Sequence, residues 1–92
     1  MARHAARAAK MLKQLANAKR LLILCQLVEG EETVLNLARK VGLSQSALSQ
    51  HLIRMKAAGL VGSERRGKKV SYFLTGREAP IILSTLHDIY CQ

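Results

Sequence analysis

The sequence is poor in aromatic residues and contains no long apolar run. It has no Trp, and Tyr72, Phe73 and Tyr90 are its only aromatic residues, so aliphatic side chains must supply nearly all of the core packing. This composition favours helices packed on helices. No apolar run approaches the roughly 20 residues that a membrane-spanning helix needs, and the start MARHAARAAK lacks the apolar stretch of a secretory signal. We therefore expect a cytoplasmic protein that has no membrane partner.

Acidic residues are scarce. Six Asp and Glu face fifteen Lys and Arg, which gives a formal net charge of +9 in 92 residues. Such a charge on a small domain favours a polyanionic partner, nucleic acid before others, although a merely soluble cationic surface would have the same composition. A chain of this length forms one compact domain, residues 1–92, with a modest core, and a homodimer would extend that core.

Only two cysteines are present, and they form no Cys-x-x-Cys motif. In a reducing compartment both should start as thiols. Cys25 lies in the apolar stretch LLILCQLVEG, where a cysteine can act simply as a small hydrophobic residue. Cys91 stands next to the last residue, where such packing is a poor explanation.

Helical spacing and capping residues predict four short helices in the first two thirds of the chain. Ala5, Ala9, Leu12 and Leu15 share one face of the first helix. The second runs from about Ala18 to Val28, with Asn17 as its N-cap and Gly30 at its end. The third is VLNLARKV at 34–41, between Thr33 and Gly42, and the fourth begins at Ser44 and continues to Ala57.

A β-hairpin and a final helix follow Gly59. LVGSE and KVSYFLT are strand-like segments, and the tract RRGKK between them predicts a basic tip. Phe73 breaks the alternation of Val70, Tyr72 and Leu74, unless the outer face is covered too. After Pro80, IILSTLHDIYC predicts an apolar helix that needs a surface to cover, and the first helix of its own or a second chain would provide one. The terminal helices are thus the expected dimer interface.

The third and fourth helices, separated by Gly42 and Leu43, have the layout of a helix-turn-helix. At about 100° per residue, Leu48, Leu52 and Met55 face the core. The outer face is small and polar, it lacks the Glu and Lys of an ordinary solvated face, and its side chains can bond base edges or phosphates. The candidate DNA-contacting residues of this helix are Ser44, Gln45, Ser46, Ser49, Gln50, His51 and Arg54, with Ile53 also facing outward.

The basic hairpin tip supports the same function. Arg65, Arg66, Lys68 and Lys69 can neutralise backbone phosphates beside the helix or place an arginine in the minor groove. A charged turn that only keeps the hairpin soluble is the plainer alternative. A helix-turn-helix followed by a basic hairpin constitutes a winged helix, so the predicted fold is mainly α with a small β-hairpin wing, and the predicted partner is double-stranded operator DNA.

Two stretches carry a family resemblance. LARKVGLSQSALSQHLIRMKAAGLV and RRGKKVSYFLT resemble the DNA-binding core of the ArsR/SmtB family of dimeric bacterial transcriptional regulators. NAKRLLILCQLVEGE and HDIYCQ resemble the branch of that family typified by HlyU and BigR. The resemblance implies that Cys25 and Cys91 sense persulfides or oxidants, and that a small sulfur or oxidant inducer relieves repression.

Three alternatives remain open. A metal-responsive repressor would need a site such as Cys25, His87 and Cys91, although the third helix has none of the cysteines that metal sensors of this family carry there. An anti-silencer would instead activate transcription by displacing another DNA-bound protein. An enzyme is disfavoured, because no catalytic motif or phosphate-binding glycine loop is present, and we expect no cofactor, no metal and no catalytic residue.

Overall fold

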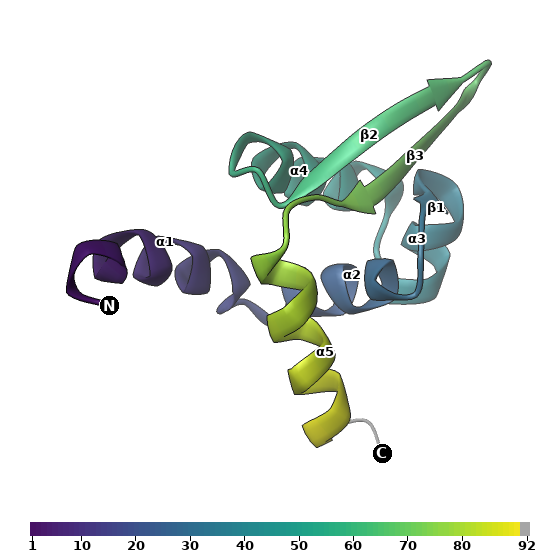
Figure 1. Cartoon of the computed structure of the whole chain (residues 1–92). Coiled ribbons are helices and arrows are strands. Elements are labelled where there is room, and N and C mark those ends of the chain that lie inside the picture. The colour runs from purple at the N-terminus through teal and green to yellow at the C-terminus, as the bar shows by residue number, and fades with distance from the viewer. Residues whose placement is uncertain (91–92) are drawn as a thin grey trace.

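The computed structural model describes residues 1–90. Figure 1 shows a helical body from which three elements extend: α1 to one side, α5 downward, and the β2–β3 hairpin upward. The elements in chain order are a short 3-10 helix at Ala2–His4, α1 at Ala5–Leu15, α2 at Ala18–Val28, β1 at Glu32–Thr33, α3 at Val34–Val41, α4 at Gln45–Ala57, β2 at Val61–Arg66, β3 at Lys69–Leu74 and α5 at Glu78–Tyr90. None of the helices in this described part is both long and apolar enough to cross a membrane.

The predicted helix boundaries are confirmed by their caps. The Asn17, Thr33 and Ser44 side chains accept hydrogen bonds from backbone N–H groups in the first turns of α2, α3 and α4, at 3.0, 3.2 and 3.2 Å. Gly42 ends α3 with a φ of +70°, a left-handed conformation that favours glycine. These caps fix the short α3–α4 turn, and with it the direction in which α4 leaves α3.

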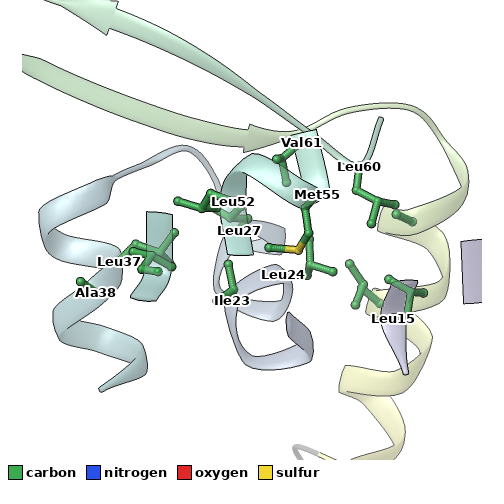
Figure 2. Close-up of a cluster of buried hydrophobic side chains, with 13 residues drawn as sticks. Leu15, Ile23, Leu24, Leu27, Leu37, Ala38, Leu52, Met55, Leu60 and Val61 are labelled. Carbon is green, nitrogen blue, oxygen red and sulfur yellow. The ribbon is translucent and has the colours of Figure 1, made fainter. Parts of the chain in front are cut away.

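The core gathers side chains from all parts of the body (Figure 2). Ile23 and Leu24 of α2, Leu37 of α3 and Leu52 of α4 are completely buried, and Leu83 brings α5 onto the same cluster. No polar or charged residue within residues 1–90 is classed as buried. At about 25 cal/mol per Å² of buried apolar surface, this aliphatic cluster is the main source of folding free energy. The expectation of an aliphatic core is therefore confirmed.

The sheet has one strand more than predicted. β1 pairs antiparallel with β3 through Glu32 opposite Tyr72 and Thr33 opposite Ser71, so the strand order is β1-β3-β2. β2 and β3 form the predicted hairpin, whose two-residue turn begins with Gly67 at a φ of +63°. The two-stranded prediction was wrong on this point, because β1 is too short to show an alternating pattern.

Phe73 is accounted for by Gly62, which lies opposite it on β2. A Cβ atom at Gly62 would lie 2.8 Å from the Phe73 ring, so the ring covers the glycine directly. The side chains of Tyr72 and Leu74 pack against the core from the other face of the strand. The outer face of the hairpin is therefore partly covered, which explains the broken alternation.

The terminal helices leave apolar side chains outside this core. In α1 only Leu15 is buried, and Leu12 of the predicted stripe is about half exposed. In α5 the residues turned inward are Ala79 and Leu83, with Ile82 beside them, whereas Ile89 of the predicted stripe is exposed. The apolar faces of these two helices are thus only partly used within one chain.

Candidate nucleic-acid interface

Burial sets the orientation of α4. Leu48, Leu52 and Met55 are completely buried, at spacings that place all three on one side of the helix. The opposite side is exposed along Ser46, Gln50 and later residues. The capped α3–α4 turn and this buried stripe together present a small, polar helix face to solvent.

The predicted contact residues fall into two groups. Ser49 and His51 are half-buried on the flanks of α4. The exposed ones are Ser44, Gln45, Ser46, Gln50 and Arg54 on or before α4, and Arg65, Arg66, Lys68 and Lys69 on the hairpin. The Ser44 hydroxyl is already an acceptor for the Ala47 amide and lies 3.5 Å from the Ser46 hydroxyl. As DNA contacts, all of these residues remain predictions.

The hairpin is tied to α4 by contacts that the sequence does not reveal. Lys56, near the end of α4, donates a hydrogen bond of 2.7 Å to the Ser63 hydroxyl on β2. At the base of the hairpin, the Thr75 hydroxyl donates to the Gly59 carbonyl at 2.8 Å, and its amide donates to the Leu60 carbonyl at 3.0 Å. These bonds couple the position of the basic tip to that of the polar helix face.

The four basic residues of the hairpin differ in their surroundings. Arg66 donates to both oxygens of Glu64, at 3.0 and 3.3 Å, and lies 3.8 Å from a Glu31 oxygen. The Glu64 carboxylate, assisted by Glu31, raises the pKa of Arg66. Within residues 1–90 no ion pair involves Lys68 or Lys69.

The Arg66 pairing was missed from sequence. Glu64 and Arg66 lie two apart on one strand, and residues at that spacing share a face. This two-residue spacing was the sequence signal from which the pair could have been predicted. Arg65 is also partly engaged, because its Nε atom donates to the Gly67 carbonyl at 3.1 Å.

A hollow of about 500 Å³ separates α4 from the hairpin and the start of α3. Ser49 and Ile53 line it from α4, and Lys68 and Lys69 line it from the hairpin. The remaining lining residues are Thr33, Val34, Leu35, Asn36, Gln45, Val70 and Tyr72. The candidate interface is therefore a concave surface with a cationic edge.

A second ion pair supports the α3 side of this surface. Lys40 of α3 donates to Glu32 of β1 at 2.6 Å. The Lys40 hydrogen bond is the main cause that lowers the pKa of Glu32, and the same pair raises the pKa of Lys40. The pair joins α3 to the sheet edge.

The structure describes only one of the two cysteines that are predicted to sense persulfides or oxidants. Cys25 is half-buried on α2 and packs against the core, whereas Cys91 lies outside the described residues. His87 is exposed on α5. Among residues 1–90 there is no group of three His, Cys, Asp or Glu side chains that could hold a metal ion.

Known proteins share this fold and much of this sequence. The model of the family described as bacterial regulatory protein, arsR family, matches residues 17–63, which include both helices of the helix-turn-helix. The transcriptional activator HlyU of Vibrio cholerae is 41% identical over 92 residues, covering 100% of this chain and 85% of that protein. The chain belongs to the arsR family of bacterial regulatory proteins.

Solved structures agree with this assignment to the arsR family. Reduced HlyU from Vibrio cholerae superposes with a TM-score of 0.95 over 100% of this chain and 97% of that one, at 41% identity. The repressor BigR from Xylella fastidiosa gives 0.92 over 100% and 94%, at 36% identity. A homodimeric winged helix-turn-helix DNA-binding domain from Mycobacterium bovis gives 0.82 over 96% and 82%, at 30% identity.

These likenesses confirm the predicted winged helix-turn-helix and the resemblance to the HlyU and BigR branch. This arsR-family chain is a DNA-binding transcriptional regulator. Its relatives are regulators and not enzymes, which confirms that expectation as well. In this fold α4 is the second helix of the helix-turn-helix, and the basic β2–β3 hairpin is the wing.

Proposed function

We propose that the chain binds operator DNA as a homodimer and represses transcription until Cys25 and Cys91 are oxidised or persulfidated. The observation that carries the DNA-binding part is the polar, solvent-facing side of α4, coupled to the wing through Lys56 and Ser63. In this arrangement α4 enters the major groove of each half-site, and the wing contacts the adjacent backbone.

The homodimer is supported by unpartnered apolar side chains on the terminal helices. Leu12, Leu22, Ile81, Ile89 and Tyr90, on α1, α2 and α5, are half exposed or more. An apolar surface of this kind on a small chain is typical of an association face. The structural neighbour from Mycobacterium bovis is described as homodimeric, which supports a two-fold assembly with α4 presented twice.

The thiol switch is supported by the contact between α2 and α5. Cys25 lies on α2, α5 packs against α2, and Cys91 directly follows Tyr90 in sequence. A Cys25 or Cys91 thiolate would take the outer sulfur of a small persulfide, whose remaining part leaves as a thiolate. The second cysteine thiolate would then attack the protein persulfide and release hydrosulfide, leaving a disulfide. A link at this place alters the packing of α5 and therefore the spacing of the two recognition helices.

The test is DNA affinity by fluorescence anisotropy at fixed salt, with mass spectrometry on the same samples. The probe is a duplex that the reduced protein has selected from a random pool. A persulfide donor should release the wild type and either add sulfur mass to it, as a persulfide or polysulfide, or lower its mass by two hydrogens through a Cys25–Cys91 disulfide, whereas Cys25→Ser, Cys91→Ser and the double variant should stay bound. Release of the double variant by the donor would contradict the switch. A zinc arm tests the metal alternative, since loss of affinity with zinc alone would favour it.

Activation by displacement of another protein is a second candidate for the sign of regulation. One relative is named a transcriptional activator and another a biofilm growth-associated repressor, so the relatives include both activators and repressors by name. A reporter gene distinguishes the two. Repression requires the selected site to overlap the promoter and expression to rise when the chain is deleted, whereas displacement requires an upstream site and a fall in expression.

A further inference from the structure

Ile53 is an apolar residue on an otherwise polar surface. It lies on the exposed side of α4 with Ser46 and Gln50, next to the half-buried Ser49, yet its side chain is aliphatic and 63% exposed. The buried side of the same helix is already filled by Leu48, Leu52 and Met55, so the core does not explain an isoleucine at this position.

The hollow beside α4 gives Ile53 a defined environment. Ile53 lines it from α4, and Leu35, which is 60% exposed, lines it from α3. Lys68 and Lys69 line the same hollow from the wing. An aliphatic surface with a cationic edge is complementary to a ligand that is apolar on one side and anionic on the other.

A nucleotide in the major groove of DNA has these two properties at one position. The phosphate supplies the negative charge, and thymine displays a 5-methyl group, which is the apolar group among the base edges of that groove. Cytosine lacks this methyl group and displays an amino donor in place of the neighbouring thymine oxygen, so it offers an isoleucine no apolar group to contact. We propose that Ile53 contacts a thymine methyl group and so specifies thymine at one position of each half-site. This proposal rests on the DNA-binding function proposed above.

The experiment replaces thymine by deoxyuridine, which removes the methyl group and leaves the base-pairing edge unchanged. The probe is the duplex selected by the wild-type protein, with each symmetry-related thymine pair replaced in turn. At one pair, wild-type affinity for the duplex should fall roughly sixteenfold, which is about fourfold for each half-site, because one buried methyl group contributes about 0.8 kcal/mol. Ile53→Ala should bind thymine and deoxyuridine probes equally at that pair.

Ile81→Ala is the matched control, since Ile81 is an isoleucine of similar exposure, 62%, on α5. Its preference for the methyl group should remain about fourfold for each half-site, whatever its overall affinity. The proposal would be overturned if the wild type bound every deoxyuridine probe as tightly as the thymine duplex. It would also be overturned if Ile53→Ala kept the wild-type preference for thymine over deoxyuridine. In both cases DNA binding itself stands. A pool that yields no preferred duplex would overturn this proposal together with the proposed function.

Discussion

Glu64 neutralises part of the positive charge of the wing, and its replacement by glutamine should free Arg66 from its main partner, with the Glu31 carboxylate still 3.8 Å away. In the structure both Glu64 oxygens accept hydrogen bonds from Arg66, at 3.0 and 3.3 Å, so one of the four basic side chains of the wing is internally neutralised. The pair is largely exposed and contributes little to folding. Glu64→Gln should therefore change DNA binding much more than stability.

The expected magnitude follows from counterion release. Each phosphate that the protein neutralises adds about 0.9 to the slope of log affinity against log salt. Two wings would each gain one contact, so the slope should steepen by up to about 1.8. The gain in affinity at 50 mM salt should then exceed the gain at 200 mM by up to about twelvefold. The assay is an anisotropy titration of one duplex over that range of salt.

Two variants separate the release of Arg66 from a general change in charge. Glu29→Gln removes a negative charge at the C-cap of α2 that is not one of the two carboxylates acting on Arg66, and should leave the slope nearly unchanged. In the double variant Glu64→Gln/Arg66→Gln the arginine that Glu64 pairs with is gone. The slope of log affinity against log salt should therefore be no steeper than that of the wild type. A slope for Glu64→Gln equal to that of the wild type would refute this reasoning, and so would a gain that persists in the double variant.

Three further predictions concern the scaffold, each checked by urea denaturation at fixed protein concentration. Leu52→Ala should lower the free energy of unfolding by about 2–5 kcal/mol, because Leu52 is completely buried, and a smaller loss would place it outside the core. Gly62→Ala should cost about 1–3 kcal/mol through the clash with Phe73, and adding Phe73→Leu should recover part of that loss. Lys40 lowers the pKa of Glu32, so this pair contributes stability above the unfolded pKa of about 4.3, which is lost as pH falls through the lowered folded value. Glu32→Gln should thus be less stable than the wild type at pH 7 but not at acid pH, and a difference independent of pH would contradict the assignment.

Local signals in the sequence predicted most of the fold. Asn17, Thr33 and Ser44 are N-caps because their side chains bond the first turn of the next helix, a local requirement that sequence shows directly. The buried side of α4 likewise follows from helical periodicity. These two kinds of signal suffice to predict the helix-turn-helix.

Contacts between segments that are distant in sequence could not be predicted from N-caps and periodicity. β1 is a two-residue strand whose partner is some forty residues away on β3, and a segment that short has no period to detect. The Lys56–Ser63 hydrogen bond and the covering of Gly62 by Phe73 depend on the three-dimensional placement of the hairpin. The Glu64–Arg66 pair was within reach of sequence reasoning, through the two-residue period of a strand. The Cys25–Cys91 hypothesis stays a prediction, because Cys91 lies outside the described residues.

Sequence-specific binding by the reduced protein is the central claim, and one competition measurement tests it most directly. The reduced chain is titrated onto its selected duplex and onto a shuffled duplex of the same length and composition at physiological salt. The proposed function predicts that the selected duplex binds at least about a thousandfold more tightly, as is typical of specific over non-specific DNA binding. Equal affinities that fall together with salt would mean that the positive charge alone holds DNA, and would contradict a recognition role for α4.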